Sequence, residues 1–194
     1  MVRHAERPSI PNGEVGNDVL LNASGLRASF AFGQSLEQEI IDIKTSSVSR
    51  CVQTATEIAK AVGYNTSNID TCSDLGAPGY FISDGDKAWY HWQEKGHQRV
   101  NEFLLEGNDQ WDGFHDLNEA AQQLKNKIEQ VLLNSDNGTH VWITHDTILA
   151  AFTARVLEKP ITLDEWPEFL GYLSIELSSS RELIFQYHPL SPAF

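Results

Sequence analysis

Cysteine is scarce in this chain of 194 residues, and long apolar runs are missing. The two cysteines, Cys51 and Cys72, cannot form a framework of several disulfides and lack the spacing of a zinc site, so buried thiols are expected. No stretch approaches the ~20 consecutive apolar residues that span a bilayer, and the N-terminus has no signal-peptide pattern. We therefore expect a cytoplasmic protein without a membrane partner, with the abrupt start at Met1 leaving open a missing leader or strand start.

Basic residues are also few. The chain has 14 Lys and Arg against 27 Asp and Glu, which gives a formal net charge of -13. Proteins that bind nucleic acid or anionic membranes usually carry surplus positive charge, so neither is an expected partner. A small anionic substrate is still compatible with this balance, because it feels the local field of its cleft.

Helix-like and strand-like patterns alternate along the chain without a linker or repeat, which predicts a single domain over residues 1–194. The predicted strands are 40–43, 69–72, 141–144, 173–177 and 183–187. The predicted helices are 24–38, with Ser24 as a candidate N-cap, then 49–62, 87–105, 117–133 and 148–156. Such alternation predicts an α/β fold, a three-layer α/β/α sandwich with a mostly parallel central sheet.

Residues 74–115 stand apart from this pattern. They begin with a loop rich in Gly, Pro and Asp and continue into a weakly helical segment rich in aromatic residues. We predict that this segment is a helical cap inserted over the active site, where it would set substrate choice.

Three clusters of polar residues follow predicted strands. They are Arg3-His4-Ala5-Glu6-Arg7, then Ser46-Ser47 with Arg50, and His145-Asp146. In open α/β sheets, ligands bind outside the carboxyl ends of the strands, so the three clusters are expected to meet at one edge. Arginine donates paired hydrogen bonds to phosphate oxygens and keeps its charge, so Arg3, Arg7 and Arg50 predict a phosphate clamp.

The same clusters carry a resemblance to a known family. The first is similar to an opening R-H-G/A motif, and Leu21-Asn22-Ala23-Ser24-Gly25 is similar to an L-T-x-x-G segment. The stretch from Thr45 to Ala55, TSSVSRCVQTA, closely resembles S-S-x-x-x-R-x-x-Q-T-A. The chain thereby resembles the histidine phosphatase superfamily, which includes phosphoglycerate mutase-like enzymes and histidine acid phosphatases.

The resemblance implies a phosphomonoester hydrolase that acts on a small phosphorylated substrate and releases inorganic phosphate. His4 would be the catalytic nucleophile and would form a phosphohistidine that water then hydrolyses. Four side chains would hold the phosphoryl oxygens: Arg3, Arg7, Arg50 and His145. Neither a metal nor an organic cofactor is expected.

The general acid is less directly indicated. Thr144-His145-Asp146 resembles the H-D pair of the acid phosphatase branch, in which the Asp donates the proton, so His145 and Asp146 are predicted catalytic residues. Ala5 and the early Pro8 depart from that branch and leave the branch open. Asp74 is the alternative acid, with Asp84 as a second candidate, because the mutase-like branch places a Glu in this loop. Asp in a glycine-containing loop is also an ordinary turn residue.

Other functions are weighed against this hypothesis. A phosphomutase would use the same pocket, and a non-catalytic protein could bind a phospholigand there. A metal-dependent phosphatase is disfavoured, because the chain has no H-x-H or H-E-x-x-H pattern and no paired D-x-D ligand set. The sequence gives no indication of the oligomeric state.

Overall fold

A six-stranded, mostly parallel sheet forms the centre of the computed structural model, which describes residues 1–11 and 13–190. The spatial order of its strands is β3-β2-β4-β1-β5-β6. The first four run parallel, whereas β5 is antiparallel to β1 and β6 to β5. In chain order the strands are β1 (Val2–Arg3), β2 (Ile40–Thr45), β3 (Asp70–Thr71), β4 (Thr139–Thr144), β5 (Tyr172–Leu177) and β6 (Leu183–His188).

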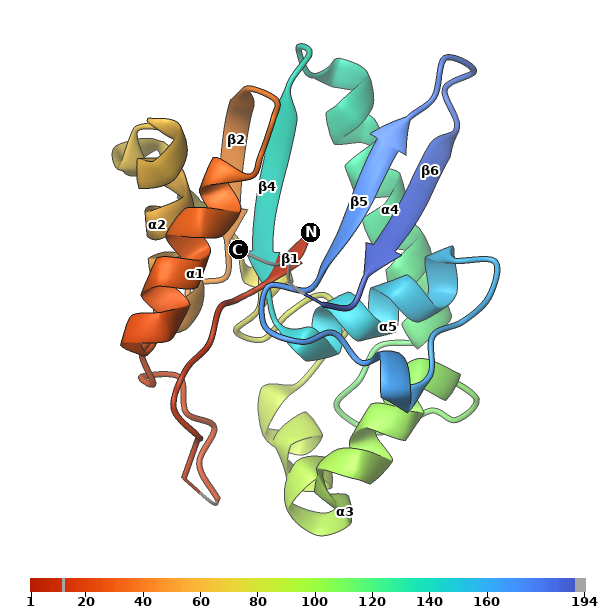
Figure 1. Ribbon diagram of the computed structural model, residues 1–194. Coiled ribbons are helices and arrows are strands. Elements are labelled where there is room, and N and C mark those ends of the chain that lie inside the picture. Colours follow the sequence, from red (N-terminus) through yellow and green to blue (C-terminus); the bar gives the residue numbers. More distant parts are fainter. Residues whose placement is uncertain (12, 191–194) are drawn as a thin grey trace.

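Helices cover both faces of the sheet, which confirms the predicted α/β class. They are α1 (Ala23–Gln34), α2 (Ser49–Val62), α3 (Gly85–Glu106), α4 (Leu117–Asn134) and α5 (Asp146–Val156). Three short 3-10 helices are η1 (Thr66–Asn68), η2 (Ser73–Leu75) and η3 (Leu163–Glu165). Helices α1 and α2 lie on one side of the sheet, α4 and α5 on the other, and α3 lies beyond one end of the strands (Figure 1).

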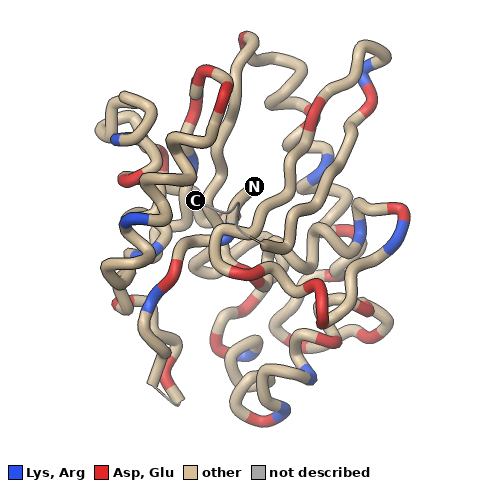
Figure 2. The backbone as a smooth tube through the Cα atoms, in the orientation of Figure 1, with Lys and Arg blue, Asp and Glu red and all other residues tan. Residues whose placement is uncertain are grey.

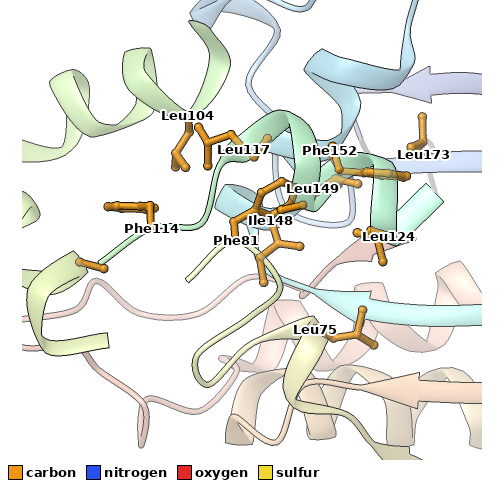
Figure 3. Close-up of a cluster of buried hydrophobic side chains, with 14 of the residues drawn as sticks. Leu75, Phe81, Leu104, Phe114, Leu117, Leu124, Ile148, Leu149, Phe152 and Leu173 are labelled. Carbon is orange, nitrogen blue, oxygen red and sulfur yellow. The ribbon is translucent and has the colours of Figure 1, made fainter. Parts of the chain in front are cut away.

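Each face of the sheet has its own buried cluster. On the α1 and α2 side, Phe32 and Ile58 pack with Ile43 of β2. The opposite cluster is larger and continues from the sheet into the α3 region. Figure 3 labels ten of its members: Leu75, Phe81, Leu104, Phe114, Leu117, Leu124, Ile148, Leu149, Phe152 and Leu173. Burial of this apolar surface fixes α3 and the loop before it to the body of the fold.

The start of α1 differs from the prediction, because the N-cap is Asn22 and not Ser24. The Asn22 side chain accepts a hydrogen bond from the Gly25 backbone N–H at 2.7 Å. A Cβ at Gly25 would lie 2.1 Å from the carbonyl oxygen of Glu6, so a glycine is needed here. The helix then ends at Gln34, four residues before its predicted end, as the Ser35 hydroxyl bonds back to the Phe32 carbonyl. This packing holds the chain that follows β1 in place.

Helix α3 is two helical segments joined at a kink. Gly96 has φ 76° and ψ 167°, a left-handed conformation that glycine adopts without a Cβ penalty. Beyond the kink, Phe103 stacks on Trp111 with ring centroids 4.1 Å apart. The weak helical pattern of the sequence therefore corresponds to a broken helix.

Candidate active site

Three neighbouring parallel strands deliver the polar clusters to one edge of the sheet. Strand β1 leads into His4, β2 leads into Ser46, and β4 leads into His145. The His4 N–H bonds to the Thr144 carbonyl at 2.9 Å, and the Ser46 N–H bonds to the Ile143 carbonyl at 3.0 Å. The sheet ladder itself thus sets the spacing of the three clusters.

His4 presents an unprotonated ring nitrogen to the site. Its Nδ1 lies 2.8 Å from the Ala5 carbonyl oxygen, which can only accept, so Nδ1 carries the proton. Its Nε2 accepts a hydrogen bond from the Arg50 Nε at 3.1 Å. Burial, followed by the charges of His145 and Arg50, holds the pKa of His4 well below its ordinary value. His4 is therefore neutral at neutral pH, with a lone pair on Nε2.

Arg50, in the first turn of α2, connects the other parts of the site. Its Nε contacts His4, its Nη1 donates to the Gly16 carbonyl at 2.7 Å, and its Nη2 lies 3.4 Å from Nδ1 of His145. Burial lowers its pKa, yet an arginine starts so high that it keeps its charge. A fixed cation therefore lies beside both histidines.

His145 is held in one tautomer and one orientation. Arg50 can only donate to Nδ1, so Nε2 carries the proton and donates to the Ser46 hydroxyl at 3.0 Å. Burial, and then the Arg50 charge, lowers the pKa of His145 to about 4. Gly76 closes the other side of the ring: a Cβ there would lie 2.4 Å from Cδ2 of His145. Sequence reasoning missed Gly76, whose only signal was its place in a glycine-rich loop.

Asp146 is the carboxylate of the site, and Arg3 is its ion-pair partner. Arg3 Nη2 lies 3.1 Å from Asp146 Oδ2, and the Trp166 indole N–H lies 3.4 Å from the same oxygen. Burial alone would raise the pKa of Asp146, but the charge of Arg3, followed by those of the two histidines, outweighs it and lowers the pKa to about 2. The side chain is 30% exposed. Asp146 is thus ionised in this state.

Arg3 is itself fixed by a segment that carries no sequence motif. Its Nη1 donates to the Pro167 carbonyl at 2.7 Å, and its guanidinium carbon lies 4.3 Å from the centroid of the Phe169 ring. Residues 166–169 lie between η3 and β5. Sequence reasoning did not find this segment, because a backbone carbonyl and a single aromatic ring form no recognisable motif.

Two guanidinium groups retain unused hydrogen-bond donors. Among the described residues, the buried Nε atoms of Arg3 and Arg7 have no hydrogen-bond partner. Arg7 uses Nη1 on the Pro8 carbonyl at 2.9 Å. Buried donors without an acceptor are costly, so these atoms favour a bound group that can accept hydrogen bonds.

A cavity of about 750 Å³ opens onto these residues. Its wall includes Arg7, Arg50, His4, His145 and Asp146, whereas Arg3 pairs with Asp146 and is not part of the lining. The arrangement combines an unprotonated nitrogen, fixed cations and a carboxylate. It can bind a tetrahedral oxyanion and attack it.

Comparison with known proteins identifies the family. The sequence profile of the histidine phosphatase superfamily (branch 1) matches residues 1–177. The chain belongs to this superfamily. It is a histidine-phosphatase-type hydrolase, as the motifs predicted.

Solved structures of other histidine phosphatases share the fold. A phosphoserine phosphatase from Entamoeba histolytica, in complex with 3-phosphoglyceric acid, has a TM-score of 0.66 at 14% identity, over 96% of this chain and 94% of the other. A mycobacterial glucosyl-3-phosphoglycerate phosphatase has a TM-score of 0.63 at 13% identity, again over 96% and 94%. The protein histidine phosphatase SixA, in complex with tungstate, has a TM-score of 0.52 at 15% identity over the same shares. No curated protein matches the chain significantly in sequence.

The alternative acid of this histidine phosphatase lies away from His4. Asp74 forms an ion pair with Lys127 and lines a separate hollow of about 430 Å³. Asp84 caps α3 by accepting hydrogen bonds from the backbone N–H groups of Asp86 and Lys87. The structure therefore brings Asp146, and neither of these two carboxylates, to the histidine pair.

The remaining expectations concern thiols, metals and membranes. Cys51 is buried as expected, and burial raises its pKa to about 12, whereas Cys72 is only half-buried. In the part of the chain that the structure describes, no three His, Cys, Asp or Glu side chains gather as metal ligands. None of the helices formed by these residues is long and apolar enough to cross a membrane.

Proposed function

We propose that this histidine phosphatase hydrolyses small phosphomonoesters through a phosphohistidine on His4. The observation that carries the proposal is the Nε2 lone pair of His4, which faces Arg50 at 3.1 Å in the cavity. A neutral, desolvated imidazole is a competent nucleophile, and the adjacent guanidinium is placed to receive the phosphoryl charge.

The first step transfers the phosphoryl group. Nε2 of His4 forms a bond to phosphorus while the bond from phosphorus to the leaving oxygen breaks. Arg50 then exchanges its contact with Nε2 for one with a phosphoryl oxygen, and the free Nε atom of Arg7 supplies a further donor. Asp146, when protonated, gives its proton to the leaving oxygen.

The second step restores the enzyme. A water oxygen attacks phosphorus, Asp146 takes the water proton, and the bond from phosphorus to Nε2 breaks to release inorganic phosphate. His145 holds its place through Ser46 and serves as a neutral neighbour of the phosphoryl group. Each proton lost in one step is recovered in the other, so the cycle needs no metal or oxidant.

Phosphate release from phenyl phosphate in the presence of a chelator tests the proposal. Wild-type enzyme is expected to turn over, and His4→Ala to lose at least about 10³-fold in kcat/KM. His115→Ala is the matched control, because His115 is exposed and lines the second hollow. Activity that survives in His4→Ala, or that disappears with the chelator alone, would overturn the proposal.

A further inference from the structure

The cavity is far larger than a phosphoryl group requires. Its volume of about 750 Å³ lies within the ~300 to 1,000 Å³ of pockets that enclose whole small molecules. The cationic groups occupy only the end at the sheet. The rest of the cavity, here called the outer chamber, extends between the loop after β1 and α3.

Apolar and aromatic side chains form much of the outer chamber's wall. The loop after β1 contributes Ile10 and Val15, the segment before α3 contributes Phe81, and α3 itself contributes Trp89. Trp89 is half-buried, yet it belongs to none of the three hydrophobic clusters formed by the described residues. A large aromatic ring that lines a cavity without serving the core is available for a ligand.

Charge in the outer chamber is negative. Among the described lining side chains, Arg7 and Arg50 are the only Lys or Arg residues, and both face the phosphoryl end. The acidic residues Glu14 and Asp86 line the outer chamber. Asp and Glu are also spread widely along the backbone of the fold (Figure 2).

The cations of α3 are engaged elsewhere. Lys87 pairs with Asp112 at 3.1 Å, and Lys95 and Arg99 lie over the ring of Trp111 at 5.4 and 5.6 Å from its centroid. None of the three lines the cavity. A carboxylate or second phosphate on the leaving group would therefore meet two acidic side chains and no lysine or arginine among the described lining residues. The other polar groups of the wall are His97 and uncharged side chains such as Asn17 and Asn101.

We propose that the outer chamber receives an uncharged, largely apolar leaving group, and that the enzyme rejects phosphomonoesters with a second anionic group. The assignment rests on the proposed function for the position of the phosphoryl group. The leaving group lies against Trp89 and the aliphatic side chains of the loop after β1. Selectivity thus comes from apolar burial together with repulsion by Glu14 and Asp86.

Calorimetric binding of two phosphonates tests this proposal without requiring turnover. Benzylphosphonate is expected to bind at least about tenfold more tightly than 4-carboxybenzylphosphonate. The double variant Glu14→Gln, Asp86→Asn is expected to reduce the ratio of the two affinities. Trp89→Ala is expected to weaken benzylphosphonate about tenfold and leave inorganic phosphate unchanged. Tyr90→Ala is the matched control, because the adjacent Tyr90 is 56% exposed and lies outside the cavity lining.

The possible outcomes distinguish failure of the outer-chamber assignment from failure of the phosphatase proposal. Equal affinity for the two phosphonates, or no binding of either, would overturn the assignment of the outer chamber. Loss of inorganic phosphate binding in Trp89→Ala would also contradict it, because that result indicates a general defect. Selective binding of benzylphosphonate without hydrolysis of phenyl phosphate would leave the outer chamber intact and refute the phosphatase proposal.

Discussion

The Arg3 guanidinium and the Asp146 carboxylate form an ion pair of 3.1 Å beside the histidine pair. The pair holds the pKa of Asp146 near 2, so the carboxylate is ionised in the free enzyme at almost any working pH. A bound phosphomonoester dianion places negative charge beside Asp146, which lines the cavity. This charge raises the pKa of the carboxyl group, so substrate binding itself favours the protonated acid.

Asp146→Asn tests the acid directly. The variant is expected to lose about 10² to 10⁴-fold in the rate of leaving-group release from an alkyl phosphate and less than about tenfold in the rate of release from 4-nitrophenyl phosphate, whose leaving group needs no proton. Single-turnover rates of phenol or alcohol release provide the measurement. Equal losses on both substrates would identify Asp146 as a structural partner of Arg3 only.

The pH dependence of alkyl phosphate hydrolysis is expected to be acidic. Because the pKa of His4 is well below its ordinary value and that of His145 is about 4, both rings stay neutral at mildly acidic pH. The rate is expected to fall as the pH rises and the bound enzyme loses the Asp146 proton. Asp146→Asn should lack that alkaline limb. A wild-type profile that stays flat from pH 5 to pH 8 would contradict the role of the acid.

Arg50→Lys is not a conservative change in this site. A lysine supplies one charge but cannot contact His4, Gly16 and His145 together from a planar fork. We expect a loss of about 10²-fold in kcat/KM and weaker inhibition by phosphate and vanadate. Arg27→Lys is the control, because Arg27 of α1 lies outside the cavity lining. Parent-like kinetics in Arg50→Lys would place Arg50 outside the reaction.

Gly76→Ala tests how His145 is positioned. The new methyl group would lie 2.4 Å from the ring of His145 and 2.6 Å from the Ser46 hydroxyl, so the ring must move. We expect kcat to fall about tenfold or more, because small displacements of a catalytic group are costly. Gly63→Ala is the matched control, since Gly63 also has a positive φ, 71°, but its Cβ would meet nothing within 4 Å. Equal activity losses in the two variants would indicate backbone strain alone.

His145 also links stability to pH. Its pKa is about 4 in the folded state and 6.5 in the unfolded chain, so only the unfolded chain takes up its proton between these values. The stability contributed by the neutral ring is complete above pH 6.5 and is lost as the pH falls to 4, by up to about 3 kcal/mol. Urea unfolding of wild type and His145→Gln across this range measures the effect. An unchanged pH dependence in the variant would contradict the buried, neutral ring.

Much of the site can be predicted from the sequence, because the apolar pattern shows where the strands end. Ile143 and its neighbours in β4 predict a buried strand, and the residues after it, His145 and Asp146, must then lie at the sheet edge. The same reasoning places His4 and Arg50. The parallel register of β2, β4 and β1 then brings residues that are far apart in sequence within hydrogen-bond distance.

The parts that the sequence could not predict depend on tertiary contacts. Phe169 holds Arg3 by lying under its guanidinium, a role that leaves no motif. Gly76 looks like any loop glycine until the ring of His145 is placed against it. The sequence predicts Ser24 as the N-cap of α1, although Asn22 is equally suitable by residue type. In the structure Asn22 also donates to the Glu6 carboxylate, a contact between segments that the sequence does not reveal.

The most direct test of the account is to trap the phosphoenzyme. Asp146→Asn, mixed with 4-nitrophenyl phosphate, is expected to accumulate it, because formation needs no acid while hydrolysis lacks its base. After quenching in alkali, which preserves phosphohistidine, mass spectrometry of the N-terminal peptide should locate the phosphoryl group on His4. The phosphopeptide should be missing from the variant that combines Asp146→Asn with His4→Ala. Turnover without any phosphohistidine, or a phosphoryl group on a different residue, would contradict the mechanism.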